Sequence, residues 1–96
     1  MSTYVIANCT IKDAAKFAEY GAQAAPTFAP YGGKLIQKGK LQATLAGTPG
    51  ASVTAIFAFA DPEAAKAWYA SDDYQALLPL REEACEMSLS IYAAPQ

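Results

Sequence analysis

The sequence predicts an α+β protein of the ferredoxin-like type, with the element order βαββαβ and a four-stranded antiparallel sheet. Three observations predict this fold. Strand-like segments occupy residues 4–11, 34–38, 52–60 and 86–93, and helix-like segments follow the first and the third of them. The length of 96 residues suits a single domain at 1–96. Right-handed crossovers then place the helices on one face of the sheet, with the first and third strands in the centre.

The first strand and helix are indicated by composition and by spacing. Residues 4–11 (YVIANCTI) mix β-branched and aromatic side chains, as strands do. Thr10 and Asp13 form a T-x-x-D signal that starts a helix. An apolar stripe at helical spacing follows: Ala14, Phe17, Gly21, Ala24 and Phe28. The prolines and glycines within residues 26–33 are expected to kink this helix and then to end it.

The middle of the chain predicts two strands joined by a loop. The lysines around residues 34–38 (KLIQK) suit an edge strand, because charges there discourage pairing with another chain. Gly39 favours a bulge or a turn, and residues 41–45 could continue the extended chain before the AGTPGA loop at 46–51. Residues 52–60 (SVTAIFAFA) are apolar on both faces, which is typical of a central strand covered on both sides.

The last third of the chain predicts a broken helix and a final strand. Asp61 begins a D-P-E triplet, which combines a capping residue, a proline at the first helical position and an acid in the first turn. A second helix is predicted from Ser71 to about Cys85, with a bend near Pro79. Residues 86–93 alternate between apolar and polar side chains, which predicts a strand with one apolar face.

The composition excludes several classes of function. With 53% hydrophobic and 17% charged residues, the chain is too apolar for a disordered protein. A net charge of −2 without a basic run argues against nucleic acid as a partner. The absence of histidine removes the commonest catalytic base and metal ligand, and no spacing matches a cofactor or metal motif. We therefore expect no cofactor and no metal, and we assign no catalytic residue.

Compartment and partner can also be anticipated. No apolar run is long enough to span a bilayer and no signal peptide is recognisable, so we expect a cytoplasmic protein without a membrane partner. Cys9 and Cys85 are then expected to be reduced thiols, and whether the pairing of the first and last strands brings them close together stays open. The uncovered sheet face would show apolar side chains to water, which favours a homodimer with two sheets face to face.

Residues 67–84 (AWYASDDYQALLPLREEA) contain the strongest candidate site, with the only Trp and the only Arg of the chain. Trp68, Tyr74 and Arg81 could line a cleft between helices and sheet that binds a small apolar or aromatic molecule, with Arg81 holding a carboxylate. Alternatively, the aromatic residues pack the helices onto the sheet and Arg81 pairs with a nearby acid such as Asp72. The sequence leaves both interpretations open.

Asn8 and Lys38 are weaker candidates for ligand binding. Asn8 lies in the middle of a strand, where a buried amide would bond either a ligand or a neighbouring backbone group. Lys38 could attract an anion, or it could serve only to protect the sheet edge and to keep the protein soluble.

Two stretches, YGGKLIQKG (31–39) and FADPEAAKAWYASDDYQALLPLREEA (59–84), resemble a family of small bacterial proteins, domain of unknown function 1330. The resemblance implies a ferredoxin-like dimer of the dimeric α+β barrel superfamily, and it implies no activity. Related dimeric barrels include cofactor-free monooxygenases, isomerases and haem-binding enzymes. Three functions therefore stay open: a binding protein, a cofactor-independent monooxygenase- or isomerase-like enzyme, and a structural dimer without a ligand.

The same resemblance implies charged residues that this chain lacks. Family members often carry an acid at the position of Asn8, Arg-Gly-Gly around residues 38–40 and Glu at the position of Ala58. If those groups form a site in the family, much of that site is missing here.

Overall fold

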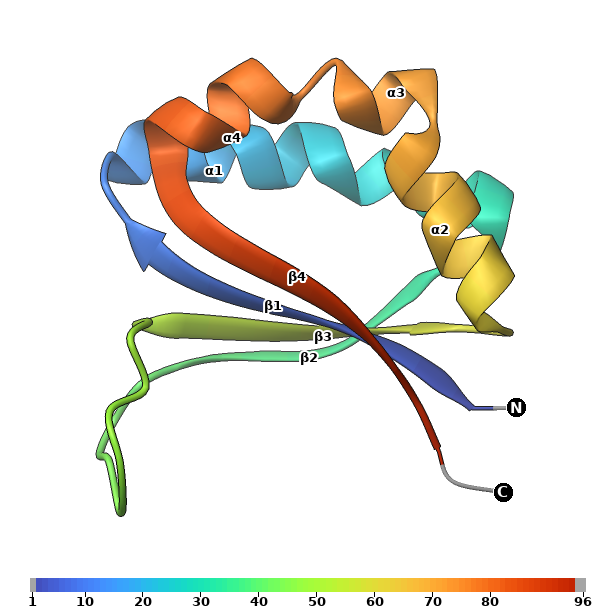
Figure 1. Ribbon diagram of the computed structural model, residues 1–96. Coiled ribbons are helices and arrows are strands. Elements are labelled where there is room, and N and C mark those ends of the chain that lie inside the picture. Colours follow the sequence, from blue (N-terminus) through green and yellow to red (C-terminus); the bar gives the residue numbers. More distant parts are fainter. Residues whose placement is uncertain (1, 95–96) are drawn as a thin grey trace.

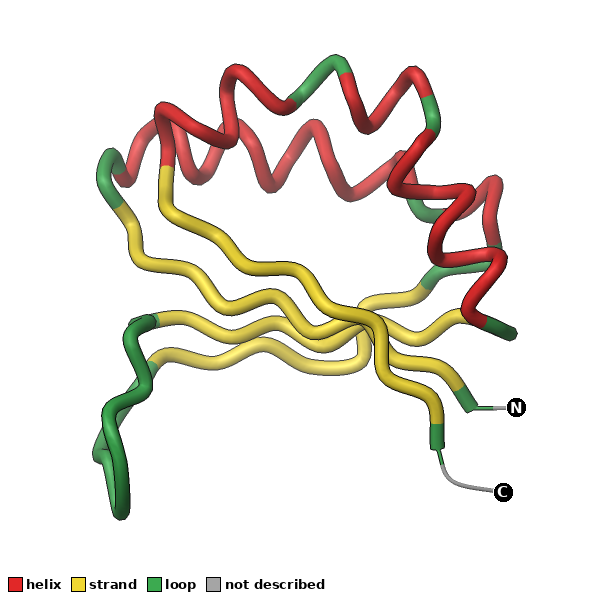
Figure 2. Tube along the Cα trace, viewed as in Figure 1, coloured by secondary structure: helices red, strands yellow, loops and turns green. Residues whose placement is uncertain are grey.

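The structure is a computed structural model that describes residues 2–94 (Figure 1). Its strands are β1 (Thr3–Ile11), β2 (Lys34–Lys40), β3 (Val53–Phe59) and β4 (Cys85–Ala93). Its α-helices are α1 (Ala14–Ala24), α2 (Pro62–Ala70), α3 (Asp72–Gln75) and α4 (Leu78–Ala84), and two 3₁₀ turns, η1 (Ala25–Thr27) and η2 (Ala29–Tyr31), follow α1. The sheet is antiparallel in the order β2-β3-β1-β4, and the helices lie over one of its faces (Figure 2). The predicted ferredoxin-like fold is thereby confirmed.

Side-chain caps start the helices where the sequence signals them, with one exception. Asp61 accepts from the backbone N–H of Ala64 at 2.8 Å, and Ser71 accepts from that of Tyr74 at 3.3 Å. The exception is α1, which is capped by Asp13 instead of Thr10. Because β1 continues to Ile11, Thr10 is still extended, and its hydroxyl donates to the Gly50 carbonyl.

Two expectations about the element boundaries were wrong, and a third is confirmed. The irregularity in β2 falls between Leu35 and Gln37, which leaves Ile36 as a bulge, and the strand then runs straight through Gly39. Residues 41–45 are not a strand. The predicted bend near Pro79 is confirmed: the helical segment breaks at residues 76–77, and Pro79 lies in the first turn of α4, where its missing N–H costs nothing.

The core lies between the helices and the sheet and consists largely of aromatic rings. Trp68 stacks on Phe28 at 4.6 Å between ring centroids and meets Tyr74 at 4.4 Å. The indole N–H of Trp68 donates to the Thr27 hydroxyl at 2.9 Å, which in turn donates to the Ala24 carbonyl. The polar edge of the indole is therefore satisfied inside the core, as a buried Trp requires.

The strand register divides the sheet into a helix-covered face and an open face. Val5, Ala7 and Cys9 point to the helices and are buried, whereas the alternate residues Tyr4 and Asn8 are exposed on the open face. β3 is paired with β1, so Thr54, Ile56 and Ala58 share the open face, and no helix among residues 2–94 covers that face. The expectation that β3 is covered on both sides is wrong for a single chain.

The two thiols lie together on the helix-covered face. Cys9 pairs with Met87 and Ile11 pairs with Cys85, which makes the cysteines diagonal neighbours on β1 and β4. Both are free and buried. Burial, and next the charge interaction with Cys85, raise the pKa of Cys9 from 9.0 to about 11. The structure thus brings the two thiols close together, which the sequence left open.

The connection from β2 to β3, residues 41–52, projects from the sheet on the side away from the helices (Figure 1). We call this segment the arm. Backbone bonds from Leu41 to Ser52 and from Ser52 to Cys9 hold its base, and Leu45 within it is 99% exposed. None of the helices in residues 2–94 is long and apolar enough to cross a membrane.

Candidate functional site

A cleft of about 350 Å³ lies on the helix-covered side of the sheet, between α2 and α4 above and β1 and β4 below. It is lined by Val5, Ala65, Lys66, Trp68, Tyr69, Arg81, Met87, Leu89, Ser90 and Ile91. Most of these side chains are apolar or aromatic, and the cleft is open to solvent on one side. An apolar cavity with a few polar groups is the usual form of a site for a small molecule.

Arg81 is the principal polar group of this cleft. Its Nη1 donates to the Tyr74 hydroxyl at 3.0 Å and to the Tyr69 hydroxyl at 3.4 Å. Its guanidinium carbon lies 5.9 Å from the centre of each of these rings, within the range of cation–π attraction. The pair of tyrosines thus holds the guanidinium from two sides.

A chain of hydrogen bonds continues from Arg81 into the core. The hydroxyl oxygens of Tyr74 and Tyr20 are 2.7 Å apart. The Tyr20 hydroxyl also lies 3.9 Å from the sulfur of Met87, to which it can donate. The guanidinium can only donate, so the Tyr74 oxygen accepts from Arg81, and the Tyr74 and Tyr20 hydroxyls share a second hydrogen bond in which either oxygen can be the donor. The Tyr74 oxygen therefore meets Arg81 as an acceptor.

The protonation states of this chain are fixed by burial and hydrogen bonding. Burial raises the pKa of Tyr20, and its neighbour Tyr74 adds to the rise. Burial likewise raises the pKa of Tyr74, although the hydrogen bonds with Tyr20 and Arg81 oppose it. Burial lowers the pKa of Arg81, but its hydrogen bonds to Tyr69 and Tyr74 outweigh burial and raise it. Both phenols are therefore neutral and the guanidinium is charged.

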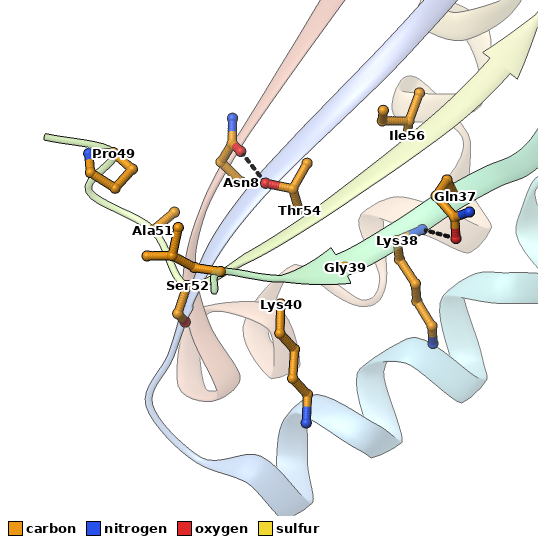
Figure 3. Close-up of a pocket in the computed structure, with 11 residues that line it drawn as sticks. Asn8, Gln37, Lys38, Gly39, Lys40, Pro49, Ala51, Ser52, Thr54 and Ile56 are labelled. Carbon is orange, nitrogen blue, oxygen red and sulfur yellow. Dashed lines mark hydrogen bonds between the residues drawn. The ribbon is translucent and has the colours of Figure 1, made fainter. Parts of the chain in front are cut away.

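A second hollow, of about 330 Å³, lies on the open face of the sheet beside the arm (Figure 3). The Thr54 hydroxyl donates to the amide oxygen of Asn8 at 2.8 Å across β3 and β1. Lys38 and Lys40 contribute only the rim, because their side chains leave β2 on the side opposite to Asn8 and Thr54 (Figure 3). The floor of this hollow is consequently neutral.

The fold and both hollows can now be compared with known proteins. A model of a domain of unknown function, DUF1330, matches residues 2–94. The chain belongs to this family. None of the curated proteins compared with the chain matches it.

Solved structures similar to this DUF1330 protein share its fold at low sequence identity. A protein of unknown function from Rhodopseudomonas palustris, RPA0582, is 17% identical, with a TM-score of 0.83 over 99% of this chain and 83% of that one. SnoaB, a cofactor-independent oxygenase from Streptomyces nogalater, is 18% identical, with a TM-score of 0.72 over 99% and 94%. A dimeric ferredoxin-like protein of unknown function from Thermobifida fusca is 14% identical, with a TM-score of 0.68 over 98% and 92%.

The predicted site residues of this DUF1330 protein fall into two groups on opposite faces of the sheet. Trp68 and Arg81 line the cleft, and Tyr74 stands behind Arg81 with no exposed surface. Asn8 and Lys38 belong to the open-face hollow, where their side chains diverge. The five candidates therefore do not form one site.

Tyr20, whose hydroxyl is bonded to that of Tyr74 behind Arg81, was missed. Tyr20 lies outside the apolar stripe predicted for α1, although α1 buries Tyr20 and Ala24 and leaves Gly21 exposed. The signal that could have revealed it is the spacing from Phe17 to Tyr20 to Ala24, which is also helical. Tyr69 adjoins Trp68, but its bond to Arg81 spans the break between α2 and α4. Within residues 2–94 no group of side chains is suited to hold a metal ion.

Proposed function

We propose that this protein is a small homodimeric binding protein that holds a small apolar or aromatic molecule in the cleft beside Arg81. The observation that carries the proposal is a cleft whose walls are apolar and aromatic around one positioned cation. Such a site needs no catalytic group, which agrees with the absence of histidine. The buried free thiols agree with a reducing compartment such as the cytoplasm.

Filling the cleft is the direct test of the binding site. Ile91 lines the cleft and is 39% exposed, so Ile91→Trp would occupy the cleft without entering the core. Ala67→Trp is the matched control, because it adds the same bulk on the exposed side of α2, outside the cleft. Binding of a panel of small aromatic molecules, followed by protein NMR shifts, should be lost in the first variant and kept in the second. Binding that survives Ile91→Trp would place the ligand elsewhere.

The homodimer is supported by the open face of the sheet. Tyr4 and Tyr92 on this face are 38% and 55% exposed, and Ile6, Ile56 and Ala58 lie beside them in register. A second copy is the simplest cover for such a patch.

Charge distinguishes between two ways of stacking the sheets about a twofold axis. On the open face, β2 carries Lys34, whereas β4 carries Glu86. Placing the β2 edge of one copy beside the β4 edge of the other brings opposite charges together, whereas β2 beside β2 brings the two copies of Lys34 together. We propose the first arrangement.

The oligomeric state tests the dimer. A native mass spectrum of freshly purified protein should show a dimer, together with any ligand that has been retained. Ile56→Glu on the open face should give a monomer, and Ala22→Glu on the exposed side of α1 should not. A monomeric native protein would overturn the dimer.

A cofactor-independent oxygenase is the second candidate function. It is favoured by the similarity in fold to SnoaB and by the Arg81 charge, which would stabilise the oxyanion of a bound phenol. In the simplest reaction of this class, a phenol and O₂ give a quinone and water. Oxygen consumption across a panel of phenols and quinols, with Arg81→Gln as the control, tests it. No consumption with the native protein would remove this candidate.

A further inference from the structure

Arg81 carries a charge that no described acid neutralises. Among residues 2–94 the ion pairs are Lys16 with Glu83 and Lys66 with Glu63, and neither involves Arg81. The alternative drawn from the sequence, in which Arg81 pairs with an acid such as Asp72, is therefore not what the structure shows. The guanidinium is only partly exposed, and a cation in such a position ordinarily has an anionic partner.

The tyrosines around Arg81 accept its protons without cancelling its charge. The Tyr74 oxygen accepts from the guanidinium and its hydroxyl shares a hydrogen bond with Tyr20, so Tyr74 meets Arg81 as a neutral acceptor. Burial keeps both phenols un-ionised, and neither becomes a counter-charge at neutral pH. The positive charge is thus retained at the wall of the cleft.

The charge is also held in a defined place. Two hydrogen bonds from one nitrogen and two ring faces at 5.9 Å restrict the guanidinium, while its other N–H groups remain to be satisfied. A planar guanidinium held in this way suits a carboxylate or another anionic oxygen, which it can bind through two parallel bonds.

The remaining walls define the rest of the ligand. Trp68 and Tyr69 supply ring surface on the helix side, and Met87 and Leu89 supply apolar surface on the sheet side. Lys66, the other cation of the cleft, is exposed and already pairs with Glu63. The cleft thus offers flat apolar walls and one uncompensated positive charge.

We propose that the ligand of this cleft is an aromatic monoanion, an arylcarboxylate or a phenolate, with its anionic oxygen on Arg81. This inference rests on the proposed binding function and names its ligand class. In this proposal Arg81 selects the charged ligand, and Tyr69 and Tyr74 position the Arg81 guanidinium.

The experiment compares a matched acid and amide on the intact dimeric protein. 2-Naphthoate and 2-naphthamide have nearly the same shape and differ in charge, and calorimetry or ligand NMR gives both dissociation constants. The acid should bind at least about 10-fold more tightly than the amide, the usual gain from a charge-assisted pair. This ratio is measured on the native protein, so it decides the question even if a variant fails to fold.

Two variants assign the effect to Arg81. Arg81→Gln should weaken 2-naphthoate by about 10- to 100-fold and leave 2-naphthamide within about 3-fold. Lys66→Gln removes the same charge from the same cleft and should leave both ligands within about 3-fold, because that side chain is exposed and already paired. An equal loss in both variants would show general attraction instead of a defined anion site.

The outcomes separate this inference from the function on which it rests. If acid and amide bind equally, the anion inference is wrong and the binding function stands. If neither binds, the binding function itself is wrong. A comparison of 4-nitrobenzoate with 4-nitrophenolate, at a pH where both are ionised, then distinguishes a carboxylate from a phenolate ligand.

Discussion

Removing one buried hydroxyl, in Tyr74→Phe, tests whether the hydrogen-bond chain behind Arg81 stabilises the fold as described. Tyr74 has no exposed surface, and its hydroxyl is bonded to Tyr20 at 2.7 Å and to Arg81 at 3.0 Å. Phenylalanine keeps the ring in contact with Trp68, so the change removes only the polar atom.

The expected loss of stability follows from the hydrogen bonds that Arg81 and Tyr20 lose and from those that they keep. Arg81 loses a charge-assisted bond, worth about 1.5–3 kcal/mol, and retains only the longer bond to Tyr69 at 3.4 Å. Tyr20 loses a neutral bond, worth about 1 kcal/mol, and keeps the weak contact with the Met87 sulfur. The deeper apolar burial of phenylalanine offsets part of this, so we expect the free energy of unfolding to fall by about 2–3 kcal/mol.

Two further variants provide a graded scale. Tyr20→Phe loses only the neutral bond and should cost about 1 kcal/mol. Tyr69→Phe loses only the long, partly exposed bond and should cost about 0.5 kcal/mol. Urea unfolding followed by Trp68 fluorescence measures all of them, at one fixed protein concentration because a dimer's stability depends on concentration.

The double variant Tyr20→Phe/Tyr74→Phe supplies the internal check. The two hydroxyls share one bond, so the double variant should cost about 1 kcal/mol less than the sum of the single variants. Equal costs for Tyr74 and Tyr69, or strictly additive losses for Tyr20 and Tyr74, would refute the chain of hydrogen bonds.

Three further predictions concern other parts of the molecule. Gly33→Ala should lower the free energy of unfolding by about 1–3 kcal/mol, because its new Cβ would lie 2.7 Å from the buried Phe59 ring. Gly21→Ala lies on the exposed side of α1, where a new Cβ has nothing within 4 Å, so this change should raise the free energy of unfolding by about 0.5–1 kcal/mol. Urea unfolding measures both variants, and changes of the same sign in the two would contradict this packing. The pKa of Cys9 is raised from 9.0 to about 11, so the unfolded chain loses this proton first and stability should fall as the pH rises from 9 to 11. Stability measured against pH should fall less in Cys9→Ala, and an identical slope in both proteins would exclude the thiol as the cause. Mild oxidation should lower the mass of each chain by about two units without cross-linking the dimer, because Cys9 and Cys85 are neighbours; mass spectrometry showing a covalent dimer instead would contradict their placement.

The parts of the fold that depend on local sequence were predictable. The caps at Asp61 and Ser71 involve residues three apart, and their side-chain chemistry alone indicates where α2 and α3 begin. The strand order follows from the handedness of crossovers once six elements are recognised. By contrast, the bulge at Ile36 depends on how β2 pairs with β3, which no local pattern encodes.

The site was predictable only in its outline. Trp68, Tyr74 and Arg81 could be placed near one another because they follow within one helical region of the chain. The hydrogen-bond partners of Arg81 could not be predicted, because an arginine with acids at short sequence spacing is expected to pair with one of those acids. The deciding contact joins Tyr20 and Tyr74, 54 residues apart in the sequence, and arises only when α1 and α3 pack together.

The bulge at Ile36 sets the phase of the rest of β2. Strand side chains alternate with a period of two, so one extra residue reverses the facing of every residue after it. With the bulge, Gln37 and Gly39 accompany Lys34 on the open face and Lys38 and Lys40 turn away from it. In a regular strand of the same sequence, Lys38 and Lys40 would instead join Lys34 there. A single inserted residue thus decides which side chains of this sheet edge lie on the open face. A relative whose strand is one residue shorter or longer here would present a different surface even if its other residues were the same.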